Sequence, residues 1–185
     1  LDWAFVNVGL RAYYAEGSKT LAYEIVEQLG WRAPDVVIAP IASGALFSKL
    51  HKGFAELAAL GLLEGFPPRL VGGQAEGCSP VATAFEQERR VVPVRPQTTA
   101  RSLAIGSPAD GDLAARTARE SGGAIYAVAE EEVGANMGLL AESAGVFGET
   151  AAGVTLGALR EALHRDRVGP DDEVVLLVTG DGLKT

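Results

Sequence analysis

Two short turns carry residue types that could hold a small ligand. The first turn follows an apolar run over residues 35–40 and comprises Ala42, Ser43, Gly44, Ala45 and Leu46. The second follows an apolar run over residues 173–178 and comprises Thr179, Gly180, Asp181 and Gly182. Ligands of open parallel sheets collect beyond the carboxyl ends of the strands, where glycine permits close approach of the backbone. We therefore expect both turns to border a binding site.

The first turn has the chemistry of an anion site. A strand-to-helix junction leaves several backbone N–H groups without partners, Ser43 adds a hydroxyl, and the helix dipole favours negative charge. These features suit a phosphate group. The glycine spacing matches neither the phosphate loop of nucleotide hydrolases nor the dinucleotide fingerprint. The alternative is a tight turn in which Gly44 only allows the following helix to pack closely.

The second turn offers a neutral hydrogen-bond donor. The hydroxyl of Thr179 can donate to a buried acceptor without bringing charge, and opposite a heteroaromatic nitrogen it would favour the unprotonated ring. The alternative is an ordinary turn in which Asp181 lies in solvent.

Four short apolar runs alternate with longer segments of helical period, which predicts an α/β fold. The runs cover residues 35–40, 69–75, 124–129 and 173–178. Continuous apolar runs of this length are typical of parallel strands covered on both faces. Helices are expected after Ser18, from Ser43 to about Leu60, from Ser79-Pro80 through Phe85, and over about 110–121, 130–144 and 149–166. The alternation predicts a right-handed three-layer sandwich with a mostly parallel central sheet.

Local signals predict where some helices begin and end. Ser18 is the predicted N-cap of a helix that Gly30 ends, and Ser79 is the predicted cap of a helix that starts with a proline. The stretch 91–108 contains three prolines and is the least regular part of the chain. It could approach a site or simply cross the edge of the sheet.

Size and charge restrict the class of protein. The 185 residues correspond to about one domain, with no need of a disulfide or metal staple, and no metal site is predicted. The single Cys78 agrees with a reducing compartment. The net charge of −8 disfavours nucleic acid and anionic membranes as partners, and no apolar stretch approaches the ~20 residues that span a bilayer. We expect a cytoplasmic protein, and the start at Leu1 without methionine suggests a piece of a longer one.

Five ordered segments resemble the C-terminal half of threonine synthase. They read AEGSKTLAYE (15–24), QAEGCSPV (74–81), ARSLAIGSPADG (100–111), ETAAGVT (149–155) and TGDGLKT (179–185). Threonine synthases are fold-type-II pyridoxal-phosphate enzymes with a large domain like that of the tryptophan synthase β chain. They convert O-phosphohomoserine and water into threonine and phosphate. The resemblance implies that residues 1–185 form one domain, the C-terminal part of such an enzyme.

The resemblance also implies roles for particular residues. Ala42 to Leu46 would bind the phosphate of pyridoxal 5'-phosphate, and Thr179 would face its pyridine nitrogen. Glu149 would lie near the face of the ring or else stabilise a helix N-terminus. Asn7 and Arg11 fall where the family lines its active site, and Arg11 could meet an anionic group of the substrate or serve as a surface charge.

The departures from the family limit what this segment can do. Fold-type-II enzymes carry their Schiff-base lysine in an N-terminal Ser-x-Lys-x-Arg setting, which none of the four lysines here has, so we expect solvated roles for Lys19, Lys49, Lys52 and Lys184. The segment alone should therefore be inactive.

The alternatives to a threonine synthase are another fold-type-II enzyme, such as a serine/threonine dehydratase or a cysteine synthase, and a non-catalytic phosphate- or metabolite-binding domain. The assembly we expect, if the protein self-associates, is a homodimer.

Overall fold

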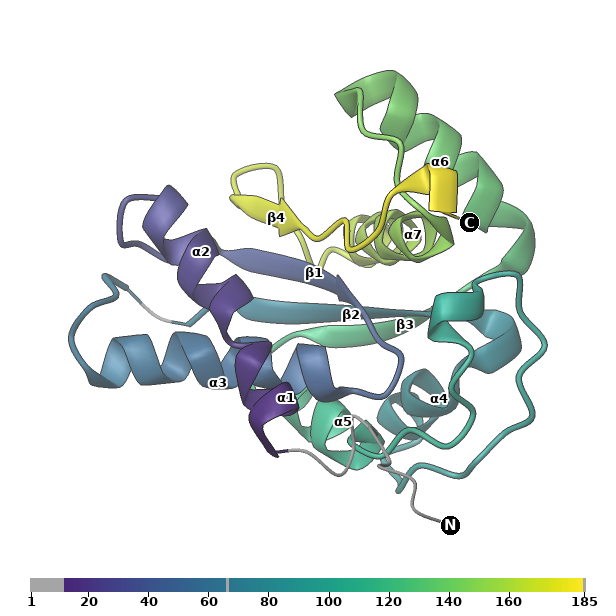
Figure 1. Cartoon of the computed structure of the whole chain (residues 1–185), viewed down its shortest axis with the longest axis horizontal. Helices are drawn as coiled ribbons and strands as arrows, with labels where there is room; N and C mark the ends of the chain where they lie inside the picture. The colour runs from purple at the N-terminus through teal and green to yellow at the C-terminus, as the bar shows by residue number, and fades with distance from the viewer. Residues whose placement is uncertain (1–11, 66, 185) are drawn as a thin grey trace, which may run out of the picture.

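The central element is a four-stranded sheet in which every pairing is parallel. The computed structural model describes residues 12–65 and 67–184. Within them the strands are β1 (Val36–Pro40), β2 (Arg69–Ala75), β3 (Ala124–Val128) and β4 (Val174–Leu176), in the spatial order β3-β2-β1-β4 (Figure 1). The register pairs Pro40 with Gly73 and Val36 with Val174. The carboxyl ends of β1 and β4 therefore lie next to each other, and the two predicted turns start from neighbouring strands.

Helices cover both faces of the sheet. The α-helices are α1 (Ala12–Gly17), α2 (Thr20–Gln28), α3 (Ala45–Ala59), α4 (Pro80–Glu86), α5 (Gly111–Glu120), α6 (Glu130–Ala144) and α7 (Thr150–His164), with short 3₁₀ turns η2 (Glu76–Cys78), η3 (Arg101–Leu103) and η4 (Gly182–Lys184). Figure 1 shows α7 on one side of the sheet and α3, α4 and α5 on the other. These are the predicted three layers.

The alternation of side chains along β1 explains the two cores. Val37 and Ala39 are fully buried against α2, α3 and α5, whereas Val36 and Ile38 are fully buried against α7. A strand that is apolar on both faces has to be covered on both. β4 differs, since its three residues are only half-buried and its pairing is shorter than the predicted run 173–178.

The predicted cap at Ser18 is wrong. The N-cap of α2 is Lys19, whose backbone is already helical because the chain arrives directly from α1. A capping hydroxyl needs an extended backbone at the cap position, and this junction provides none. Gly30 ends the helix as predicted, with a left-handed φ of 73°.

Ser79 precedes α4 as predicted, but its hydroxyl does not cap the helix. It donates to the carbonyl of Glu76 at 3.1 Å. The N–H groups of Val81 and Ala82, which have no acceptor within the first turn of the helix, donate instead to Oε1 of Gln74, at 2.8 and 3.0 Å. Gln74 is fully buried on β2, so a side chain from the sheet caps this helix.

Within the described part of the chain, no helix combines the length and apolarity that crossing a membrane requires.

Candidate active site

A pocket of about 190 Å³ lies beyond the carboxyl end of β1. Four segments that are far apart in sequence line it: the end of β1 with the start of α3, η3, the start of α7, and the chain after β4. The lining residues are Pro40, Ala42, Ser43, Gly44, Leu46, Phe47, Ser102, Leu103, Glu149, Ala151 and Thr179. The two turns predicted from the sequence therefore share one pocket.

The first turn is shaped by close contact with the start of α5. Gly44 has a φ of 92°, a left-handed conformation that favours glycine. The N–H of Asp110 donates to the carbonyl of Ser43 at 2.9 Å, and a Cβ on Gly44 would lie 2.6 Å from the carbonyl oxygen of Asp110. Gly44 thus allows close packing of the backbone, which was the alternative interpretation of this turn. The turn nevertheless also lines the pocket.

Several backbone N–H groups of this turn have no acceptor among the described residues. The first intrahelical bond of α3 runs from Ser48 to Gly44, and Ala45 donates only to the neighbouring hydroxyl of Ser43 at 3.3 Å. The N–H groups of Ala42, Ser43 and Gly44 make no hydrogen bond there. Free donors at the start of a 15-residue helix suit a phosphate. Ala45 itself is buried behind the pocket wall.

The second turn is held against the start of α7. The N–H of Glu149 donates to the carbonyl of Gly180 at 3.0 Å, and the N–H of Gly182 donates to the carbonyl of Phe147 at 3.0 Å. A Cβ on Gly180 would lie 2.5 Å from the Glu149 carboxylate, and a Cβ on Gly182 would lie 2.6 Å from the Phe147 ring. Both glycines therefore make room for the segment that leads into α7.

Glu149 and Thr179 reach the pocket from this junction. Glu149 is the N-cap residue of α7, but its carboxylate caps no N–H group of that helix and packs on Gly180 instead. Thr179 is exposed, and its hydroxyl makes no hydrogen bond among the described residues. The pocket is open to water on this side.

Ser102 and Leu103 line the pocket although no site role was predicted for them. They belong to η3, in the irregular stretch 91–108. The carboxylate of Glu130 at the start of α6 anchors this stretch, because it accepts from the N–H groups of Gly77 and Thr99 at 3.1 and 3.0 Å and from the Thr99 hydroxyl. Burial raises the pKa of Glu130, but these hydrogen bonds together outweigh it and leave the pKa below its ordinary value. A short 3₁₀ turn has no apolar periodicity, so only the matching segment 100–111 pointed here.

Lys19, Lys49 and Lys52 form ion pairs away from this pocket, so the expected solvated roles are wrong for Lys19 and Lys49, whose side chains are only 15% and 20% exposed. Glu16 is bridged by Lys19, Lys49 and Lys52 at 2.7 to 2.9 Å, and Lys19 also pairs with Glu56 at 2.7 Å. The Lys19, Lys49 and Lys52 ammonium groups hold the pKa of Glu16 well below its usual range. Lys184 is exposed in η4. None of the four lines the pocket. Asn7 and Arg11, the predicted substrate residues, lie outside the described residues.

Comparison with known proteins places the chain in a family. The sequence model of the family described as pyridoxal-phosphate dependent enzymes matches residues 1–180. The chain belongs to this family. The match agrees with the predicted fold and with pyridoxal phosphate as the cofactor of the family.

Curated relatives support the predicted resemblance to threonine synthase. The chain is 34% identical over 177 residues to the threonine synthase of Methanocaldococcus jannaschii, which covers 95% of the chain and 44% of that protein. It is 37% identical over 169 residues to the threonine synthase of Mycobacterium tuberculosis, covering 91% of the chain and 45% of that protein. The chain therefore spans less than half the length of these relatives.

Solved structures share the fold. An L-serine ammonia-lyase from Rhizomucor miehei superposes with a TM-score of 0.73 at 23% identity, covering 92% of the chain and 53% of that structure. Threonine synthase from Escherichia coli superposes with a TM-score of 0.71 at 17% identity, covering 95% and 40%. At these identities the likeness concerns the fold alone, and it confirms the fold-type-II architecture.

Proposed function

We propose that this chain is the cofactor-holding C-terminal segment of an enzyme that converts O-phosphohomoserine and water into threonine and phosphate. The observation that carries the proposal is the shared pocket, which is lined both by the turn after β1, with its free N–H groups, and by Thr179 after β4. The resemblance to threonine synthases over 91–95% of the chain supports the choice of reaction.

The residues of the pocket fit pyridoxal phosphate by their chemistry. The N–H groups of Ala42, Ser43 and Gly44 would bind its phosphate, with the hydroxyl of Ser43 beside them. Thr179 would donate to its ring nitrogen. Glu149 would lie close to Thr179, because its side chain packs on Gly180. Pyridoxal phosphate, when bound, supplies an electron sink for carbanions derived from amino acids.

The protein contributes orientation and electrostatics. The anion-binding amides are fixed by the contact between Gly44 and α5, so they are preorganised before a ligand arrives. A neutral threonine at the ring nitrogen would favour the unprotonated nitrogen and so would moderate the electron sink. This is the behaviour expected of an enzyme that carries out elimination and addition.

The rest of the activity belongs to chain outside these 185 residues. We propose that an N-terminal part supplies the lysine that binds the cofactor and much of the substrate site, and that Asn7 and Arg11 contact the substrate. A cytoplasmic location and a homodimer remain predictions.

The proposal is tested with the complete protein encoded by the gene. We expect a Ser-x-Lys-x-Arg segment upstream of Leu1, and we expect the complete protein to release phosphate from O-phosphohomoserine and form threonine in equal amounts. The 185-residue segment alone serves as the control and should be inactive. Conversion of threonine or serine to an oxo acid without phosphate release would assign the protein to the dehydratases instead. Absence of the lysine segment from the natural protein would contradict the enzymatic proposal.

A further inference from the structure

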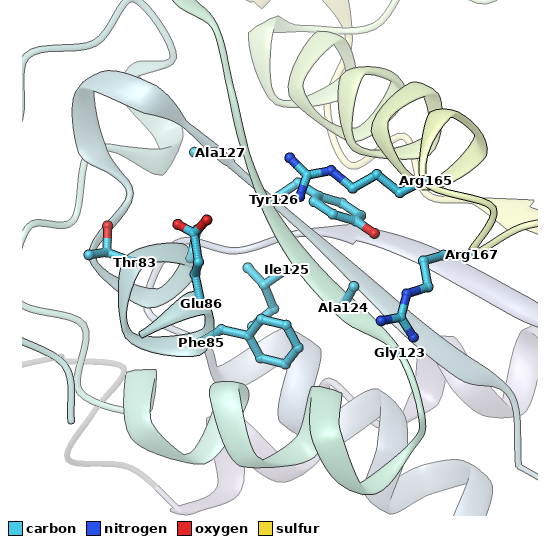
Figure 2. Close-up of a pocket in the computed structure, with 11 residues that line it drawn as sticks. Thr83, Phe85, Glu86, Gly123, Ala124, Ile125, Tyr126, Ala127, Arg165 and Arg167 are labelled. Atoms are coloured by element: carbon cyan, nitrogen blue, oxygen red, sulfur yellow. The ribbon is translucent and has the colours of Figure 1, made fainter. Parts of the chain in front are cut away.

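A second cavity, of about 250 Å³, lies at the edge of the sheet along β3. It shares no lining residue with the candidate active site. Within the described residues β3 pairs with β2 only, so its outer edge is open, and residues 123–127 form one wall. Figure 2 shows side chains on both sides of this strand, with Tyr126, Arg165 and Arg167 toward α7 and Phe85, Glu86 and Ile125 toward α4. The cavity is therefore a recess between two helices.

The end of α7 brings two cations to this recess. Asp166 has a left-handed φ of 54°. The N–H of Asp166 donates to the carbonyl of Leu163 and that of Arg167 donates to the carbonyl of Ala162, which is the Schellman arrangement of a helix end. The chain reverses there, and Arg165 and Arg167 both line the cavity.

Tyr126 places an unused hydroxyl in the same recess. The residue is 7% exposed overall, and its hydroxyl, which has no hydrogen-bond partner among the described residues, is not fully buried and can be reached from the recess. The guanidinium carbon of Arg165 lies 5.2 Å from the centre of its ring. Burial raises the pKa of Tyr126 although the charges of Arg165 and Arg167 act in the opposite direction. The hydroxyl therefore stays protonated near neutral pH and is available as a donor.

The surroundings leave this cationic side incompletely neutralised. Arg165 pairs with Glu161 at 3.2 Å in an exposed ion pair, and such pairs are weak. The guanidinium of Arg167 makes no hydrogen bond or ion pair with the described residues. Glu86 lies across the strand, on the α4 side, without a partner there. The apolar part of this opposite wall is formed by Phe85 and Ile125, which lie beside Thr83 and Glu86.

A helix C-terminus by itself favours cations, so the dipole of α7 accounts for arginines at this position. It does not account for the Tyr126 hydroxyl beside these cations, or for a cavity between them and the side chains of Phe85 and Ile125. The hydroxyl reaches solvent, so it is a donor that a ligand in the recess could use. The chain as a whole carries a net charge of −8, so a recess lined by two arginines also differs from it in the sign of its charge.

We propose that this recess is a binding site for a small organic anion, in which a carboxylate or phosphate group accepts hydrogen bonds from the Tyr126 hydroxyl and from the guanidinium groups of Arg165 and Arg167. The apolar part of the ligand packs on Phe85 and Ile125. The site lies at the opposite end of α7 from Glu149, and it does not depend on the function proposed above.

The test uses the complete protein saturated with pyridoxal phosphate, so that the pocket after β1 is not available to the probe. Succinate and inorganic phosphate are titrated separately by calorimetry, with succinamide as the uncharged control. We expect at least one of the two anions to bind at a site that the substitutions below weaken, separate from any phosphate that the active site binds as its product, and we expect no binding of succinamide. Whichever anion binds more tightly identifies the ligand as a carboxylate or a phosphate.

Variants locate the site. Tyr126→Phe keeps the ring and removes the hydroxyl, and Arg167→Gln removes an unpaired charge, so each should weaken binding about tenfold or more. Arg116→Gln is the matched control, because Arg116 is an exposed arginine in an i,i+4 pair with Glu120 on α5. It should leave the affinity unchanged. Failure of both anions to bind, equal effects of the three substitutions, or unchanged binding by Tyr126→Phe would overturn the proposal.

Discussion

The turns after β1 and β4 border the same pocket but are built differently. The turn after β1 is positioned by backbone against backbone, since Gly44 is buried and lies against the carbonyl of Asp110. The turn after β4 is also tied by backbone hydrogen bonds, from Glu149 to Gly180 and from Gly182 to Phe147, but the contact next to Thr179 is made by a side chain, since Gly180 lies against the carboxylate of Glu149. A backbone contact cannot move without displacing α5, whereas a glutamate side chain can change rotamer. The backbone of both turns is therefore fixed, but the second turn also has an adjustable side chain, Glu149, beside it.

The difference suits the chemistry proposed for each wall. A phosphate needs several N–H groups fixed at once, and this requires a rigid backbone. A single hydrogen bond to a ring nitrogen needs only one donor in reach. Substitutions at the first turn should therefore cost stability, and substitutions at the second should alter the bound cofactor more than the fold.

The largest effect is expected for Gly44→Ala. The substitution places a Cβ at a left-handed φ, which costs about 1–2 kcal/mol, and drives it into backbone, which adds about 1–3 kcal/mol. We expect the free energy of unfolding, measured in urea, to fall by about 3 kcal/mol or more. Gly61→Ala is the control, because Gly61 has a φ of 70° and nothing within 4 Å of its Cβ position. If both variants lose the same amount, the contact with Asp110 is not what shapes the turn.

The next effect is expected for Gln74→Leu. This change leaves the N–H groups of Val81 and Ala82 without their acceptor and removes the bond from Nε2 to the carbonyl of Ile41, 3.3 Å away, just before the first turn. Unsatisfied buried groups cost about 1–3 kcal/mol, so thermal unfolding should show a loss of about 2 kcal/mol. Ser79→Ala should cost less than about 0.5 kcal/mol, because its hydroxyl does not cap α4. A larger loss for Ser79→Ala than for Gln74→Leu would contradict the assignment of the cap.

A smaller effect on stability is expected for Gly180→Ala. The new Cβ meets the flexible end of Glu149, which can swing away, so the loss should stay below about 1 kcal/mol. The absorption spectrum of bound pyridoxal phosphate should nevertheless change, because Glu149 moves within the pocket. Glu149→Ala in the Gly180→Ala background should restore the lost stability. An additive loss in the double variant would show that the two residues are not coupled.

The smallest change in stability is expected for Thr179→Val, since the side chain is exposed and makes no hydrogen bond among the described residues. The free energy of unfolding should stay within about 0.5 kcal/mol. In the complete enzyme the absorption spectrum of the cofactor should shift and the turnover should fall, whereas Thr179→Ser should retain both. A spectrum and rate unchanged by the valine would remove Thr179 from the proposed role.

Much of the fold could be predicted because it depends on local patterns. The apolar runs at 35–40 and 69–75 became β1 and β2, and the helix expected over 130–144 became α6 with the same bounds. Burial on both faces needs continuous apolar residues, and this signal is readable along the chain. Prediction failed at the cap of α2, because the preceding helix had already set the backbone of Lys19.

The sequence by itself determined the alternation of strands and helices and the family, since periodicity, glycine positions and matching segments are properties of the chain. Only the tertiary structure decided which side chains meet. Gln74 caps a helix from within the sheet, Ser102 reaches the pocket from an irregular stretch, and Tyr126 faces two arginines at the end of α7. The reason is physical. A hydrogen bond or a pocket wall between residues distant in sequence depends on how the layers pack, and no local spacing records that geometry.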